Sequence, residues 1–166
     1  MPEQTLIELL YGKRAHANPV ACVEDLTADL AERRVENLPH SVYQIVWHMN
    51  FWMDYELRRI RGDKPRYPDH ASESWPAPAP PEEAAWKKEV ARFADLIGVL
   101  AAMAQGDSNA LSREIPATHS TQEAATSTVL AILWQTLAHN SYHVGQIALL
   151  RRALDVWPPR GGGDSW

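Results

Sequence analysis

Apolar residues along this chain follow the period of an α-helix almost throughout. They recur every three to four positions in five stretches: residues 3–16, 19–32, 41–62, 81–106 and 121–156. This spacing gives a helix one buried face. Strand patterns are absent, because no alternating run rich in valine, isoleucine and threonine is framed by hairpin turns. The pattern predicts an all-α protein and leaves open whether the first two stretches form one kinked helix or two.

Residues at the ends of these stretches match the preferences of helix termini. Ser41 is a good N-cap for the helix that continues to Gly62, and Gly62 is a natural C-terminal stop. Pro81 and the two glutamates after it suit the first turn of the next helix, where the helix dipole favours acids. Asn18-Pro19 and Pro158-Pro159 mark the start of the second stretch and the end of the last.

A linker from Asp63 to Pro81 holds six prolines. It is too long for an ordinary turn between bundle helices, so we expect an ordered crossover or lid. Such connections change the up-and-down order of a bundle. At 166 residues the chain has the length of one domain. The expected fold is a single domain over residues 1–166, a four-helix bundle with a long proline-rich crossover between helices 2 and 3.

Charge and composition narrow the range of partners. The net charge is −5, and the densest basic stretch, residues 58–66, is interrupted by Gly62 and Asp63, whereas nucleic-acid binders show a basic face. No apolar run approaches the ~20 residues that cross a bilayer, and the first residues lack a leader pattern. We therefore expect neither nucleic acid nor membrane as a partner. Cys22 is the only cysteine, which suits a small buried residue in a cytoplasmic protein.

Three histidines fall on the core-facing sides of two predicted helices. His139 and His143 are four residues apart, so their side chains are neighbours on one helix face. Steps of about 100° per residue group them with Ile132, Thr136, Gln146 and Leu150. The same steps group His48 with Ser41, Ile45, Trp52, Tyr55 and Arg59. Buried imidazoles need partners, either hydrogen bonds in the core or a metal ion, and three together favour the metal.

The residues around these histidines argue against two familiar metal sites. Asn140 follows His139, where a zincin protease carries the glutamate that acts as its base. The Glu-x-x-His pattern of di-iron bundles is missing from every predicted helix. His16 ends the first stretch, where a cation suits the helix dipole, and it is also a candidate for the mouth of the site. Three further histidines are expected to be solvated in loops: His40, His70 and His119.

Several segments form a recognisable pattern across essentially the whole chain. They are Pro39-His40-Ser41, Trp47-His48-Met49, Glu73-Ser74-Trp75-Pro76, His139-Asn140-Ser141-Tyr142-His143-Val144-Gly145-Gln146-Ile147 with Leu150-Arg151-Arg152, and the ending from Pro158 to Trp166. With them, the chain resembles the DinB-like superfamily. That superfamily includes damage-inducible-type proteins and bacillithiol- and mycothiol-dependent transferases, and it is unrelated to the DNA polymerase that shares its name.

The resemblance implies a four-helix bundle, commonly a homodimer, that holds a divalent metal ion with three histidines. By motif match the ligands are His48, His139 and His143. Zinc or nickel is the expected metal, with iron and manganese as alternatives. The resemblance does not imply a particular activity for this chain, because many members of the superfamily have no assigned reaction. No motif in this chain specifies a thiol cofactor.

The function expected of such a site is that of a metal-dependent enzyme acting on a small molecule. An ion held by three neutral histidines keeps its charge, so a thiol or water beside it loses a proton near neutral pH. The reaction would be transfer of a low-molecular-weight thiol or hydrolysis. Gln146 would orient the substrate or a ligand. Trp52 and Tyr55 would wall the cavity, although both also suit an ordinary core.

The alternative is a non-catalytic, metal-binding stress-response bundle that acts as a structural, sensory or interaction protein. The two functions make different demands on the metal site. An enzyme needs open coordination positions that face a pocket, whereas a structural site is closed by a fourth protein ligand, such as His16 or an acid.

Overall fold

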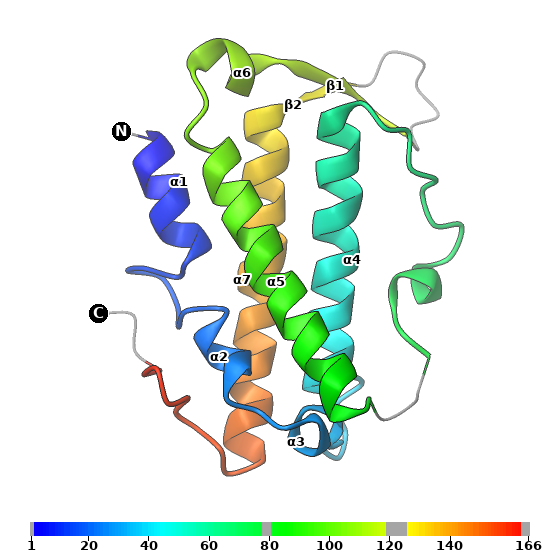
Figure 1. Ribbon diagram of the computed structural model, residues 1–166, viewed down its shortest axis with the longest axis vertical. Helices are drawn as coiled ribbons and strands as arrows, with labels where there is room; N and C mark the ends of the chain where they lie inside the picture. The colour runs from blue at the N-terminus through cyan, green and yellow to red at the C-terminus, as the bar shows by residue number, and fades with distance from the viewer. Residues whose placement is uncertain (1, 78–80, 119–125, 164–166) are drawn as a thin grey trace.

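Four helices pack side by side as a bundle: α1 (Pro2–Leu10), α4 (Val42–Arg61), α5 (Glu83–Met103) and α7 (Val129–Ala153) (Figure 1). The computed structural model describes residues 2–77, 81–118 and 126–163. Shorter helices flank the bundle: α2 (Ala21–Glu24), α3 (Ala28–Glu32), the 3-10 helix η1 (Ala71–Ser74) and α6 (Ser108–Ser112). The prediction of an all-α bundle is confirmed.

The long crossover sets the direction of the helices. In Figure 1, α4 and α5 both run upward, whereas α1 and α7 run downward. Because the chain between α4 and α5 returns along the outside of the bundle, two helices that follow each other in sequence are parallel. The proline-rich linker therefore changes the up-and-down order, as predicted.

The ends of α4 follow from local sequence. The side chain of Ser41 accepts from the amide of Gln44 at 3.3 Å, and the Gln44 side chain accepts from the amide of Ser41 at 3.2 Å. This reciprocal pair is a capping box. Gly62 ends the helix with a φ of +97°, in the left-handed region that glycine adopts without strain. Both predicted ends of this helix are confirmed.

The first stretches of the chain depart from the prediction. The first helix ends at Leu10 and not at His16. Gly12 has a φ of +79°, and a β-carbon there would lie 2.5 Å from the carbonyl oxygen of His16, so the chain turns tightly at this glycine. The second stretch, 19–32, forms two short helices, α2 and α3, and not one continuous helix. Thr27, between them, has an extended backbone, and its side chain caps α3.

Two short strands contradict the prediction of a chain without strands. β1 (Glu114–Pro116) pairs antiparallel with β2 (Thr126–Thr128). Thr128 has an extended backbone and caps α7 by accepting from the amide of Ala131 at 3.1 Å, so the last helix begins later than the expected Thr121. Thr121 itself lies outside the described residues. Two helices end earlier than the predicted stretches 81–106 and 121–156. The last residue of α5 is Met103, and the last residue of α7 is Ala153.

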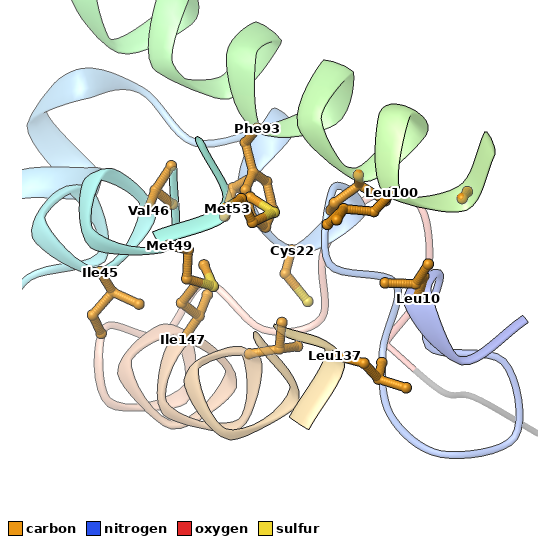
Figure 2. Close-up of a cluster of buried hydrophobic side chains, with 14 of the residues drawn as sticks. Leu10, Cys22, Ile45, Val46, Met49, Met53, Phe93, Leu100, Leu137 and Ile147 are labelled. Carbon is orange, nitrogen blue, oxygen red and sulfur yellow. The ribbon is translucent and has the colours of Figure 1, made fainter. Parts of the chain in front are cut away.

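The hydrophobic core lies between the four helices (Figure 2). Met49 and Met53 of α4, Phe93 of α5 and Ile147 of α7 are completely buried in it. α7 is also buried on the side opposite His139, where Leu133 is inaccessible, which explains why this helix is apolar on two sides. Among the described helices, each is either too short or too polar to cross a lipid bilayer.

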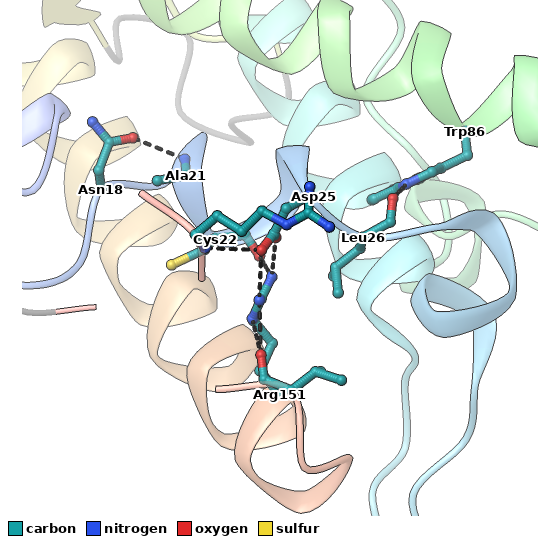
Figure 3. A network of polar contacts seen from close by, with 9 residues as sticks. Asn18, Ala21, Cys22, Asp25, Leu26, Trp86 and Arg151 are labelled. Atoms are coloured by element: carbon teal, nitrogen blue, oxygen red, sulfur yellow. Dashed lines mark hydrogen bonds and ion pairs between the residues drawn. The ribbon is translucent and has the colours of Figure 1, made fainter. Parts of the chain in front are cut away.

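Arg151, near the end of α7, fixes the N-terminal segment to the bundle (Figure 3). Its guanidinium, 2% exposed, donates to both carboxylate oxygens of Asp25 at 2.6 and 3.2 Å and to the carbonyl of Cys22 at 2.9 Å. Burial by itself raises the pKa of Asp25, but hydrogen bonds from Arg151 and from the Arg160 amide outweigh it and hold that pKa below its ordinary value.

Cys22 is buried, as predicted, and burial raises the pKa of its thiol to about 11.

Replacing Asp25 with alanine is expected to lower the free energy of unfolding by roughly 3 kcal/mol, because the buried guanidinium of Arg151 loses its counter-ion. Urea unfolding measures the change. The control is Asp29→Ala, whose ion pair with Arg33 is 80% and 52% exposed and is worth less than about 0.5 kcal/mol. An effect at Asp25 no larger than the control would show that this ion pair does not hold the segments together.

Candidate metal centre

The three histidines singled out by their spacing meet between two helices of the bundle. His48 lies in the middle of α4, and His139 and His143 lie one turn apart on α7. Each presents a ring nitrogen, and these nitrogens all lie within 4.8 Å of one another. His48 and His143 are buried and His139 is half-buried. Packing of α4 against α7 thus brings together residues about 90 positions apart in sequence.

Hydrogen bonds fix which nitrogen of His48 and of His143 faces the cluster. Nδ1 of His48 donates to the carbonyl of Ser74 at 2.9 Å, and Nδ1 of His143 donates to the side-chain oxygen of Gln146 at 2.7 Å. A neutral imidazole carries one proton, so the Nε2 atoms of His48 and His143 carry lone pairs. Each of these two atoms lies 3.2 Å from Nε2 of His139.

This arrangement leaves one nitrogen–nitrogen contact without a proton. His139 donates from Nε2 to at most one of its two neighbours, so the other contact places two lone pairs 3.2 Å apart. A cation at the centre satisfies all three nitrogens. Two imidazole nitrogens that each lie about 2.05 Å from a zinc ion at tetrahedral angles are ~3.3 Å apart, close to the observed spacing. The donor set therefore fits a divalent metal ion.

Burial keeps the cluster neutral. Desolvation lowers the pKa of His48 and of His139 to about 4, from an ordinary 6.5, and lowers the pKa of His143 in the same direction. The Ser74 carbonyl opposes the change at His48, and the Gln146 side chain opposes it at His143, but burial outweighs both. Imidazole rings that are neutral at pH 7 can bind a metal ion without first losing a proton, because a proton and a metal ion compete for the same lone pair.

The crossover covers His48 from outside the bundle. Trp75 follows η1 and stacks face to face on His48, with ring centres 3.9 Å apart. His40 stacks on the opposite face of Trp75 at 3.6 Å, since two rings cannot share one face at these distances. The prediction that His40 is solvated is therefore wrong. Neither this stack nor the Ser74 contact has a local signal in the sequence, because each joins segments separated by a long linker.

The sequence predicts three further side chains at the site, and the structure places each of them. Gln146 contacts the cluster through its hydrogen bond to His143. Trp52 lies edge-on to His48, with ring centres 6.4 Å apart. Tyr55 is buried and packs edge-on against Trp52, with ring centres 5.4 Å apart. Gln146 and Trp52 thus contact the clustered histidines directly, whereas Tyr55 contacts Trp52.

The other described histidines are not part of the cluster. His16, the candidate for the mouth of the site, instead pairs through Nε2 with the hydroxyl of Ser141 at 2.9 Å. His70 is exposed, as predicted. His119 lies outside the described residues. Among the residues that the structure describes, the only group of metal-binding side chains comprises the three clustered histidines, with no fourth histidine, cysteine or acid.

A pocket of about 490 Å³ adjoins the cluster at His139, a size typical of sites for small molecules. Three α4 residues, Trp52, Glu56 and Arg59, line it from one side. Residues of α7, the crossover and the strand region complete the lining: Gln135, Thr136, Tyr67, Ala117, Thr126 and Ser127. Helical spacing places Arg59 on the face of His48, but nothing in the sequence assigns a role to it or to Glu56.

Comparison with known proteins identifies one family. The family described as the DinB superfamily matches residues 12–147, which is more than half of the chain. This stretch includes all three clustered histidines and Gln146. Neither the curated proteins nor the solved structures gave a match.

The metal-free protein is expected to lose stability as the pH falls from about 6.5 towards 4. In this interval unfolded histidines bind protons that the folded cluster, with pKa values near 4 at His48 and His139, does not bind. The free energy of unfolding therefore rises with pH, with a slope of at most about 1.4 kcal/mol per pH unit for each histidine. Urea unfolding with a chelator across this range measures the slope. His139→Gln should reduce the slope of the free energy of unfolding against pH. An unchanged slope in this variant would contradict the lowered pKa of His139.

Proposed function

The chain belongs to the DinB superfamily, and from this premise we propose that its three histidines bind one divalent metal ion for chemistry on a small molecule. The reaction is transfer of a low-molecular-weight thiol or hydrolysis. One observation carries the proposal: the Nε2 atoms of His48 and His143 both face Nε2 of His139 at 3.2 Å, and a single proton cannot satisfy both contacts. Zinc or nickel suits three imidazoles best, with iron and manganese as alternatives.

The metal supplies a Lewis acid that lowers the pKa of a thiol or a water molecule into the neutral range. The protein contributes the arrangement around it. The carbonyl of Ser74 and the side chain of Gln146 hold the proton of their histidines on Nδ1, so that Nε2 is free to coordinate. Trp75 stacks on His48 and shields it from water.

Gln146 is a positioning residue in this proposal. Its side-chain oxygen is engaged by His143 at 2.7 Å, which orients that ring. Trp52 forms the aromatic wall beside the cluster, and Tyr55 holds Trp52 in place from behind. The substrate enters the pocket that adjoins His139 and meets Thr136 on α7 and Trp52 on α4.

A structural or sensory metal site is the competing function. Such a site is normally closed by four protein ligands. Three imidazoles, with no fourth ligand among the described residues, leave at least one coordination position for a reactant. The neighbouring pocket of about 490 Å³ gives that reactant a place to bind. Both observations favour an enzyme over the non-catalytic alternative.

Replacing His143 with alanine is expected to abolish stoichiometric zinc or nickel binding, because two imidazoles remain and the orienting contact of Gln146 is lost. Elemental analysis after dialysis measures the metal content. The control is His70→Ala, an exposed histidine outside the cluster. Gln146→Ala is expected to keep the site and weaken affinity by about 10–100-fold. Full metal content in His143→Ala would refute the ligand assignment.

The same variants test catalysis. A screen of thiol transfer to electrophiles and of ester hydrolysis, run with and without chelator, should give activity that depends on metal and is lost in His143→Ala. A protein that binds metal stoichiometrically and stays inactive in the whole screen would favour the non-catalytic function.

We also propose that the protein is a homodimer that pairs through α7. The expectation rests on the family, and the exposed side of this helix supports it. Trp134, Tyr142 and Leu149 are 38%, 66% and 62% exposed. Ala138 and Gly145 lie between them on the same side and are exposed too, so a second helix can approach closely. A contiguous apolar stripe of this kind is typical of an interface, and a twofold axis would pair it with itself.

Light scattering is expected to give twice the chain mass of 18.7 kDa. Leu149→Glu places a charge in the stripe and should shift the protein to a monomer. Ala102→Glu, at an exposed position on α5, is the control and should leave the dimer intact. A monomeric wild-type protein would remove this proposal without affecting the metal site.

A further inference from the structure

One of the three clustered histidines lacks the kind of partner that the other two have. Nδ1 of His48 donates to the carbonyl of Ser74, and Nδ1 of His143 donates to Gln146. The hydrogen-bond contacts of the His139 ring within the described chain both involve Nε2. A histidine that binds a metal ion through Nε2 carries its proton on Nδ1 and normally donates it to an oxygen. A metal ion in the cluster therefore makes Nδ1 of His139 a donor that requires an acceptor.

Asn140, the next residue on α7, has a buried oxygen without a donor. The residue is only 4% exposed. Its Oδ1 has no hydrogen-bond partner among the described residues. Its Nδ2 donates to the sulfur of Met53 at 3.2 Å, and a thioether is a weak acceptor. Burial of an amide with one weak hydrogen bond costs free energy, so its place in the core indicates a role other than packing.

The side chains of His139 and Asn140 already influence each other. Burial lowers the pKa of His139 most and His143 lowers it further, whereas the Asn140 side chain raises it. An acceptor near a ring nitrogen has this effect, because it stabilises the ring when that nitrogen carries a proton. The two groups are thus neighbours without the geometry of a completed hydrogen bond. Both side chains end in a torsion with broad energy wells, so a rotation of either one can complete the bond.

We propose that Asn140 is the positioning residue for His139, with Oδ1 accepting from Nδ1 of that ring when the cluster binds a divalent metal ion. All three rings then have an oxygen partner on Nδ1 and present a lone pair on Nε2 to the same point. The inference rests on the proposed function, since it concerns the metal ion that the three histidines bind. It goes further by assigning control over metal affinity to a core residue that is not one of the ligands.

The substitution Asn140→Leu separates a positioning role from a structural one. Leucine has the same branched skeleton as asparagine without its polar atoms. In metal-free protein the variant should unfold at the same temperature as the wild type or higher, because a poorly satisfied buried amide is removed. It should nevertheless bind zinc about 10–100-fold more weakly, because His139 loses the acceptor that orients it. A merely structural residue would lower both the unfolding temperature and the affinity.

Competition with a chromophoric chelator measures the zinc affinity of the full-length protein and its variants. The matched control is Asn50→Leu on α4. Asn50 is completely buried and its Oδ1 also lacks a partner among the described residues, but its Nδ2 donates to Glu89 on α5. This control should bind zinc as tightly as the wild type. Asn140→Asp keeps an acceptor oxygen at the same place and should bind zinc far more tightly than the leucine variant.

Nuclear magnetic resonance of the zinc-loaded protein reports the bond directly. The Nδ1 protons of all three ligand histidines should exchange slowly with water in the wild type, because each is held by an oxygen. In Asn140→Leu the signal of His139 should be lost to rapid exchange, while the signals of His48 and His143 remain. A spectrum of His139→Gln identifies which signal belongs to His139.

The outcomes distinguish this inference from the proposed function. Wild-type affinity in Asn140→Leu overturns the inference alone, as does an equal loss of affinity in Asn50→Leu or a rapidly exchanging His139 proton in the wild type. A much lower unfolding temperature in Asn140→Leu, with weak zinc binding also in Asn140→Asp, overturns it in favour of a structural role. A wild-type protein that binds no zinc overturns the proposed function and the inference together.

Discussion

Three imidazole nitrogens that face one point between α4 and α7 are the constraint on which the site depends. Hydrogen bonds from Nδ1 of His48 and His143 to Ser74 and Gln146 leave lone pairs on both Nε2 atoms. Both atoms lie 3.2 Å from His139, and one proton cannot bridge two such contacts. Burial prevents the protein from resolving the conflict by protonation at neutral pH. A cation among the three rings resolves it, because each lone pair then has a partner.

The crossover between α4 and α5 has two roles in this arrangement. It lets two consecutive helices run parallel, which changes the order of the bundle (Figure 1). It also supplies the Ser74 carbonyl and the Trp75 ring that hold His48. A short turn would have left that histidine open to water, with its tautomer undetermined. The same segment contributes Tyr67 to the pocket beside His139, so it contacts both the histidine cluster and the adjoining pocket.

Local sequence determined the parts of the molecule that depend on neighbouring residues. The start of α4 follows from Ser41 and its end from Gly62, because capping is a contact within one turn. The four-residue step between His139 and His143 places them on one face of α7 for the same reason. Local rules failed where a distant partner competes. The strand residues Thr126–Thr128 fall within the stretch predicted as the last helix, but pairing with Glu114–Pro116 keeps them extended.

Only the tertiary structure decided what surrounds the histidines. His40 stands in a loop, and its ring stacks on Trp75, which lies thirty-five positions further along the chain. Glu56 and Arg59 resemble an ordinary helix-surface pair until strands and crossover enclose them in a pocket. The sequence by itself therefore determined the main helices, both ends of α4 and the three clustered histidines, because periodicity and spacing act over a few residues. The orientation of these rings and the chemistry of the pocket came from contacts between segments far apart in sequence.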